Sequence, residues 1–174
     1  LLFARVAFEQ SFDKCFKDYD NLYQVHSIFT MNGEQLDPQE QNCGPVAGAI
    51  LENFPKEVEA ATSCSQEMSD PLYNGSVEAR KIAVDSLFFQ TMGVEVLSGT
   101  PVKDLAQKDI IYLSDRLARK MFDTENPIGK VISYRKEIEL TVKGTYADIP
   151  ENATVRPEAV ISLPTLLTRN WGNY

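Results

Sequence analysis

Apolar residues recur at helical spacing in two parts of the first third of the chain. A stripe of apolar residues at spacings of three and four predicts an amphipathic helix over residues 3–20. The stripe consists of Phe8, Phe12, Cys15, Phe16 and Tyr19. Gly44-Pro45 opens a second predicted helix, because proline suits the first helical turn, and Pro55 ends it. The expected buried face of this helix consists of Val46, Ile50, Leu51 and Phe54.

Two stretches rich in β-branched and aromatic residues flank the second helix. They predict strands over residues 22–31 and 58–64. Asn32-Gly33 indicates a turn after the first strand, and residues 34–42 are expected to form a loop. The order strand, helix, strand is that of a split βαβ unit.

The rest of the chain follows a change of composition at Ser69-Asp70-Pro71 and predicts shorter elements. The expected strands cover residues 77–84, 109–113, 131–134, 138–146 and 159–163. Asp85 and Ser114 are predicted helix N-caps, and Pro164-Thr165 starts a last helix. Apolar and polar residues alternate over residues 138–146, which predicts an antiparallel hairpin with residues 131–134 and one solvated face. The predicted fold class is α+β.

The length and net charge of the chain limit the number of domains and the classes of binding partner that we expect. The 174 residues fit one large domain or two small ones. The net charge of −8 argues against nucleic acid and against a face that docks on anionic lipid. No stretch approaches the roughly 18 apolar residues that span a bilayer. Leu1-Leu2-Phe3-Ala4 fits either the outer end of a membrane helix or an ordinary helix start. The sequence ends at Trp171-Gly172-Asn173-Tyr174, just after the start of a predicted helix, which suggests a piece of a larger protein.

The sequence contains few residue patterns typical of catalytic sites, and we expect no catalytic, cofactor-binding or metal-binding residues. His26 is the only histidine, and no serine lies in a Gly-x-Ser-x-Gly elbow. Asn126-Pro127-Ile128-Gly129-Lys130 is expected to be a turn and not a phosphate loop. The acidic pairs Glu57/Glu59 and Glu137/Glu139 are typical of exposed strand faces. The basic cluster on the helix after Ser114 is expected to be its solvated face and consists of Arg116, Arg119 and Lys120.

Three cysteines, Cys15, Cys43 and Cys64, have no zinc-binding spacing. Cys43 precedes the second helix, and Cys64 ends the strand that returns antiparallel to it. A Cys43–Cys64 disulfide is therefore feasible in an oxidising compartment, if the two Cα atoms lie about 4.4–6.8 Å apart.

Six short segments, taken in order, resemble the MacB-like periplasmic core domain of MacB/FtsX-type ABC transporter permeases. They are Glu9-x-Ser11-Phe12-Asp13 with residues 20–25, residues 54–59, residues 84–89, residues 113–122, residues 126–130 and residues 142–152. The similarity covers roughly residues 9–174 and implies a location between the first and second membrane helices of a permease. The segment would then face the periplasm or cell exterior of a bacterial inner membrane.

The resemblance also implies an organisation and a set of partners. Residues 1–18 would be a helix leading from the first membrane span, residues 19–68 and 156–174 a porter-like lobe, and residues 69–155 an inserted lobe. The porter-like lobe lacks its second strand–helix–strand half, which would expose a sheet edge. The domain would be non-catalytic and would transmit conformational change. Implied partners are the permease's own transmembrane helices, a cytoplasmic ATPase that is a separate domain or subunit, and an adaptor protein or an exported peptide, drug or lipoprotein.

Two other function classes stay open on the sequence. A free-standing periplasmic or secreted binding module would have a complete signal peptide and no membrane helices. A small hydrolase would have a pocket with converging acids of perturbed pKa; the single histidine, His26, makes this the weakest of the three.

Overall fold

A mixed six-stranded sheet organises the computed structural model, which describes residues 5, 8–40, 42, 44–72, 76–123, 126–135 and 137–168. The strand order is β3-β8-β5-β7-β4, and β6 also pairs with β7. The strands are β3 (Lys81–Val84), β4 (Val96–Ser98), β5 (Ile110–Ser114), β6 (Val131–Tyr134), β7 (Ile138–Tyr146) and β8 (Ala159–Ser162). The helices are α2 (Val46–Asn53), α3 (Phe88–Met92), α4 (Pro101–Asp104), α5 (Asp115–Phe122) and α6 (Leu163–Leu167), with a 3-10 turn η1 (Tyr19–Asn21).

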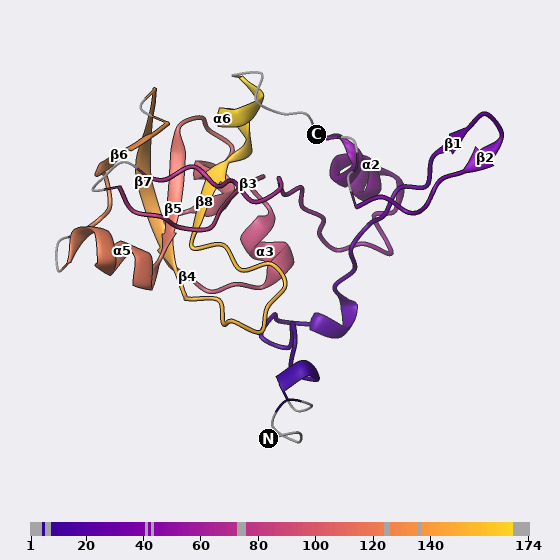
Figure 1. Cartoon of the computed structure of the whole chain (residues 1–174), viewed down its shortest axis with the longest axis horizontal. Coiled ribbons are helices and arrows are strands. Elements are labelled where there is room, and N and C mark those ends of the chain that lie inside the picture. The colour runs from indigo at the N-terminus through magenta and orange to yellow at the C-terminus, as the bar shows by residue number, and fades with distance from the viewer. Residues whose placement is uncertain are drawn as a thin grey trace.

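The N-terminal part of the chain leaves this sheet as an arm, which we define as residues 22–40. The arm ends in a two-stranded hairpin of β1 (Thr30–Met31) and β2 (Glu34–Gln35) and projects away from the sheet (Figure 1). Helices alternate with strands along the chain, and the sheet contains both parallel and antiparallel pairs. The α+β class predicted from the sequence is therefore confirmed.

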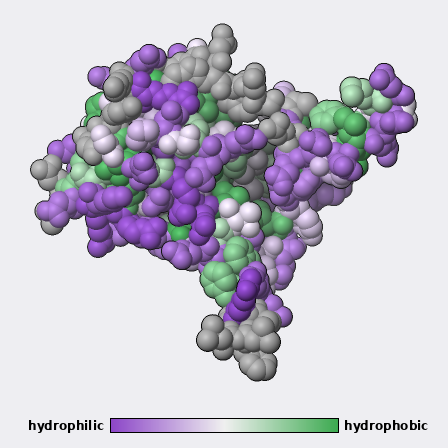
Figure 2. All heavy atoms as spheres, in the orientation of Figure 1, coloured by the Kyte–Doolittle hydropathy of each residue, from purple (hydrophilic) through white to green (hydrophobic). Residues whose placement is uncertain are grey.

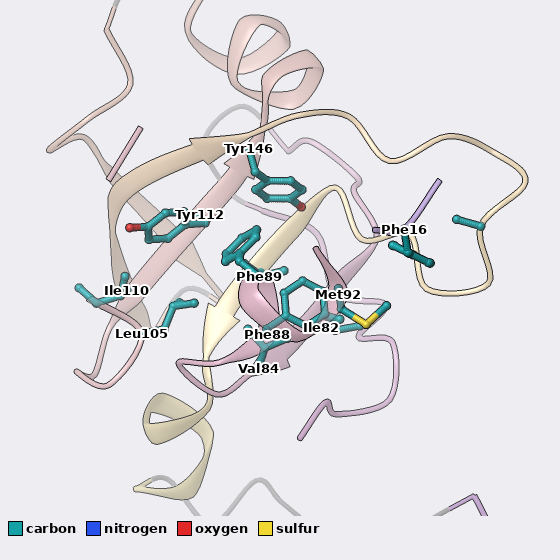
Figure 3. Close-up of a cluster of buried hydrophobic side chains, with 12 residues drawn as sticks. Phe16, Ile82, Val84, Phe88, Phe89, Met92, Leu105, Ile110, Tyr112 and Tyr146 are labelled. Carbon is teal, nitrogen blue, oxygen red and sulfur yellow. The ribbon is translucent and has the colours of Figure 1, made fainter. Parts of the chain in front are cut away.

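The sheet has a hydrophobic core on each face, because its central strands point apolar side chains both ways. On β5, Ile110 and Tyr112 belong to one core, whereas Ile111 and Leu113 belong to the other. The first core lies against α3 and includes Phe88, Phe89, Tyr112 and Tyr146, whose rings pack against one another (Figure 3). The second lies against α5 and includes Leu117, Ala118, Leu140 and Val142. We call them the α3-side core and the α5-side core.

A β-bulge at Lys143 lets one strand serve both cores. Ile111 pairs with Val142, but the next residue of β5, Tyr112, pairs with Gly144, so Lys143 is the extra residue. Val142 consequently lies in the α5-side core and Tyr146 in the α3-side core. Gly144 is needed there, since a Cβ would approach the Tyr112 ring to less than 3 Å.

Several predicted elements are confirmed close to their predicted bounds. They are β5, α5, the β6–β7 hairpin, β8, α6 and α2. The alternation along β7 is confirmed too, with Leu140 and Val142 buried and Glu139 and Lys143 exposed. The predicted antiparallel hairpin β6–β7 is confirmed, and β4–β7 and β5–β8 are antiparallel too, whereas β5–β7 and β3–β8 are parallel. The β5–β7 pair is parallel because α5 and β6 together form the crossover that returns β7 alongside β5.

The helix predicted over residues 3–20 is confirmed at the described residues 5, 8 and 9 and is wrong from residue 10 onward. Residues 10–18 form turns, and η1 follows. Asp13 and Asp18 adopt left-handed backbone conformations, with φ of 59° and 58°, which interrupt a right-handed helix. Of the apolar stripe, only Phe16 is buried.

The two strands predicted around α2 also differ in the structure. Residues 22–31 contain only the short β1, and the predicted loop over residues 34–42 contains its partner β2. Asn32 and Gly33 both have positive φ, as a type I′ hairpin turn requires, so that turn prediction is confirmed. Polar residues on β2 concealed the second strand from the sequence pattern.

Residues 58–64 form no regular strand. The chain instead runs irregularly beside β3, with single bridges at Cys64 and Met68. The Ser65 N–H donates to the Ala83 carbonyl over 2.8 Å, but the Ala83 N–H donates to the Ser65 side-chain Oγ over 2.8 Å in place of a backbone carbonyl. The predicted strand–helix–strand unit is therefore reduced to α2 and two irregular flanks.

Two further details refine the sequence-based elements. Leu87, not Asp85, is the N-cap of α3, and the predicted buried face of α2 is only partly covered, with Phe54 54% exposed. β8 pairs with both β3 and β5, so residues 159–162 share a sheet with strands of residues 69–155. The division into two lobes stays a prediction.

Candidate functional site

Two segments far apart in the sequence meet at what we call the clasp, formed by Ser11, Asp13, Asn152 and Thr154. The Asn152 Nδ2 atom donates to the Ser11 carbonyl over 2.9 Å and to its hydroxyl over 2.8 Å. The Asp13 N–H donates to the Asn152 carbonyl over 2.9 Å. These bonds tie the N-terminal segment to the loop that follows β7.

The Asp13 carboxylate completes the clasp. Its two oxygens accept hydrogen bonds from the Thr154 N–H and the Thr154 hydroxyl, each over 2.7 Å. Hydrogen bonds to a carboxylate are stronger than those between neutral groups. Asp13 has a left-handed backbone conformation, which is incompatible with a continuous right-handed helix through this segment.

Apolar side chains next to the clasp pack in the α3-side core. Phe16 and Ala153 are both buried in the α3-side core, one on each side of the contact (Figure 3 labels Phe16). Lys17 lies directly over Gly93 at the end of α3, where a Cβ would approach the lysine backbone and Cβ too closely. The N-terminal segment is therefore joined to the sheet by hydrogen bonds and by the core.

The clasp brings together two of the segments that carry the family resemblance, residues 9–13 and 142–152. The sequence also contains an Asn-x-Thr pattern at residues 152–154, but the Asn152 amide and the Thr154 hydroxyl are both used in the clasp. Sequence reasoning did not find the contact, because its partners are 141 residues apart.

A second junction, at the start of α5, links residues 113–122 to residues 142–152, which also take part in the clasp. Ser114 Oγ accepts from the Leu117 N–H over 3.3 Å, so the predicted N-cap is confirmed. Asp148 accepts from the Arg116 N–H over 3.1 Å, which adds a negative charge at the positive end of the helix. The predicted turn at residues 126–130 is also confirmed: Asn126 Oδ1 accepts from Ile128 N–H, and Gly129 has φ of 83°.

A strap over residues 62–72 closes the outer edge of β3. Asp70 binds the far end of the sheet, accepting from Arg135 Nε over 2.7 Å and from the Tyr134 hydroxyl over 3.3 Å. The hydrogen bond from Arg135 lowers the pKa of the Asp70 carboxyl below its usual value. This strap protects an edge that would otherwise be open to pairing.

The residues singled out for catalysis do not converge. His26 is exposed on the arm, Glu57 and Glu59 are outside the sheet, and Glu137 lies in the β6–β7 turn. Within the described ranges, no group of three or more His, Cys, Asp or Glu residues is placed to hold a metal ion. A shallow cavity of about 280 Å³ beside α5 contains Ser98 and Thr145, whose hydroxyls bond each other over 2.9 Å.

The predicted basic face and the cysteines fall in different settings. Arg116, Arg119 and Lys120 are exposed on α5, as expected, and Arg119 pairs with Asp115 over 2.8 Å. Cys64 has a free thiol, and Cys43 lies outside the described residues. Although Cys64 as a residue is exposed, local desolvation raises the pKa of its thiol to about 12. The Cys43–Cys64 disulfide stays a prediction.

The comparisons with known proteins rest on fold. No protein-family model matches the sequence, and no curated protein matches it either. A domain assigned to a permease protein from Porphyromonas gingivalis matches with TM-score 0.65 and 22% identity, over 86% of this chain and 65% of that one. The extracellular domain of the noncanonic ABC-type transporter YknZ from Gram-positive bacteria matches with TM-score 0.51 and 18% identity, over 64% and 59%.

A third solved structure, the periplasmic region of MacB from Actinobacillus actinomycetemcomitans, matches with TM-score 0.57 and 16% identity. That match covers 92% of this chain and 75% of the MacB chain. The molecule is thus an α+β domain with a mixed sheet and a clasped N-terminal segment. Its fold is that of the MacB-like extracytoplasmic domains of ABC transporter permeases. No helix among the described residues combines the length and apolarity needed to cross a bilayer.

Proposed function

We propose that this chain is a non-catalytic extracytoplasmic domain of an ABC transporter permease, facing the periplasm or cell exterior. The observation that supports it most is the shared fold with three transporter domains of this kind. The order of the six sequence segments points the same way. In such a permease, membrane helices of the same chain and a cytoplasmic ATPase would be its partners.

The clasp gives the domain a means of transmitting conformational change. Residues 9–13 would follow the first membrane helix, so a movement of that helix reaches Ser11 and Asp13 first. The five hydrogen bonds of the clasp and the buried Phe16 then pass the displacement to the loop after β7 and so to the sheet. Packed cores transmit such displacements because they are close-packed and deform little.

The location can be tested by labelling. In a background with all three cysteines changed to serine, Lys103→Cys places one thiol on exposed α4. We expect a membrane-impermeant maleimide to label this thiol in intact spheroplasts and to leave the protein in the membrane fraction. Labelling only after lysis would contradict the location. Labelled protein released with the soluble periplasmic proteins would favour a free-standing binding module.

The clasp can be tested with Asn152→Ala and Asp13→Ala in the permease reconstituted with its ATPase. We expect basal ATP hydrolysis to stay unchanged while coupled transport falls about tenfold, the change that corresponds to roughly 1.4 kcal/mol of lost coupling. Arg119→Ala is the control, because it removes an exposed ion pair on α5, away from the N-terminal segment. Equal loss in the control, or full transport in both clasp variants, would reject a coupling role.

A further inference from the structure

The loop that joins β7 to β8, residues 147–158, is held together at its two ends and within its length. We call it the β7–β8 loop. The Tyr146 hydroxyl, at the end of β7, donates to the Pro157 carbonyl over 2.9 Å and so ties the start of the loop to its end. Arg156 Nη1 donates to the Glu151 carbonyl over 2.7 Å. The apolar residues of the loop that lie in or against the α3-side core are Ile149, Ala153 and Val155.

The tip of the β7–β8 loop is the part that forms the clasp. Asn152 and Thr154 bind the N-terminal segment there through the five hydrogen bonds described above. In Figure 1 the loop extends from beside α5 to the N-terminal segment. Because the loop is held together internally, a displacement of its tip also displaces its base.

Both ends of the β7–β8 loop meet on one residue, Arg116, in the first turn of α5. Asp148, near the start of the loop, accepts from the Arg116 N–H over 3.1 Å. Glu158, at the end of the loop, has its Oε1 atom 3.6 Å from Arg116 Nη2. The Glu158 carbonyl also accepts from the N–H of Ser114, the N-cap of α5, over 2.8 Å. The loop that binds the N-terminal segment at its tip therefore holds the start of α5 at its base.

Arg116 differs in this respect from Arg119, one turn further along α5. Both side chains are exposed, and Figure 2 shows hydrophilic side chains over this helix. Arg119, however, pairs with Asp115 of its own helix. Leu117 and Ala118, next to Arg116, are buried in the α5-side core. Arg116 therefore joins a loop that packs on one face of the sheet to a helix that packs on the other.

We propose that Arg116 is a positioning residue through which the clasp sets the position of α5. A displacement of the N-terminal segment moves the β7–β8 loop as a unit, and both ends of that loop act on Arg116. Sequence reasoning placed Arg116 only on a solvated face. Its part in transport rests on the proposed function, whereas the coupling between the clasp and α5 is a property of this chain alone.

A double-mutant cycle on the 174-residue chain tests the coupling. The base variant, Asp148→Ala with Arg116→Ala, removes both contacts of Arg116 to the loop, and it is combined with Asp13→Ala in the clasp. Groups that share no contact normally act additively on the unfolding equilibrium. We expect the combined variant to unfold with an equilibrium constant about threefold smaller than additivity gives, because breaking either end of the connection already releases the other.

Asp115→Ala with Arg119→Ala is the matched control, because it also removes one acid and one arginine from the start of α5. Its effect should be additive with that of Asp13→Ala. Additivity in the base variant would overturn the proposal. Equal non-additivity in the control would overturn it too, because the coupling would then come from general weakening of the fold.

Hydrogen exchange provides a second readout, since coupling between two sites is reciprocal. The base variant should accelerate exchange of the Asp13 amide about threefold, and the control variant should leave it unchanged. An unchanged Asp13 amide in the base variant would contradict the proposal.

The same variants distinguish this inference from the proposed function. In the reconstituted permease, the base variant should reduce coupled transport as the clasp variants do. Additivity in the isolated chain overturns the role of Arg116 even if the clasp variants reduce transport. Coupling in the isolated chain, with full transport in both clasp variants, supports the role of Arg116 in positioning α5 and rejects the proposed function.

Discussion

Lys81 is a lysine buried within the sheet. It lies on β3 with no exposed surface, and its Nζ donates to the Ala79 carbonyl over 2.6 Å. Burial lowers the pKa of this lysine, although Asp70 and other nearby acids act in the opposite direction. The charged form of Lys81 is therefore disfavoured by its position within the sheet.

Lys81→Met should stabilise the protein at pH 7 by about 1 kcal/mol, because it removes a buried amino group whose charged form is disfavoured and keeps a long side chain. The sign follows from the pKa. Since the folded-state pKa is lowered, protons bind the unfolded chain more tightly, and the wild-type protein gains stability as pH rises toward the unfolded value of about 10.4.

The advantage of Lys81→Met should accordingly shrink between pH 7 and pH 10 in urea unfolding curves. Arg156→Met is a suitable comparison, because this cation is outside the sheet and makes a single hydrogen bond to Glu151. A loss of stability in Lys81→Met at pH 7 would show that the surrounding acids outweigh the cost of burial.

Elements with strong local signals were predictable, and α5 is the clearest case. Its serine cap, its apolar inner face and its basic outer face are all adjacent in sequence, and all were found in the structure. The hairpin β6–β7 was equally predictable from the alternation of apolar and polar residues along β7. These elements need little information from the rest of the chain.

Elements defined by distant contacts were not predictable. The N-terminal apolar stripe has helical spacing, but the segment around Asp13 forms turns. The Asp13 carboxylate there accepts a hydrogen bond from Thr154, 141 residues away. Residues 58–64 have strand composition, yet this part of the chain meets β3 only through single bridges, and the Ala83 N–H bonds the Ser65 side chain and not a backbone carbonyl. The clasp itself left no local signal except that both of its segments belong to the family resemblance.

Ser114→Ala tests the cap of α5 directly. Loss of the bond to the Leu117 N–H should destabilise the protein by about 1 kcal/mol, the usual cost of removing a serine cap. Chemical unfolding measures it, with Ser69→Ala as the control at an exposed position. An unchanged midpoint would mean that Asp148 alone satisfies the helix start.

At the scale of the whole molecule, stability is unequal between the sheet and the arm. The residues of β5 and β8 are buried throughout, because the sheet is covered on both faces. The arm and α2 contain no fully buried residue among those described. Local opening costs little where few apolar contacts are broken, so the arm should open without the sheet.

Amide hydrogen exchange should therefore divide the chain in two. We expect the amides of β5 and β8 to exchange at least about 100-fold more slowly than those of β1, β2 and α2, because only global unfolding exposes them. Asn152→Ala should accelerate exchange at Asp13 and Phe16 and leave β5 unchanged, since it releases the clasp alone.

Uniform protection across the chain would contradict this division and would mean that the arm and the sheet unfold as one unit. The distinction matters for how the molecule works. A rigid sheet joined to the N-terminal segment by the clasp can carry a displacement, while a separately opening arm can adapt to a partner. Both properties require that the two parts differ in stability, which the exchange pattern measures directly.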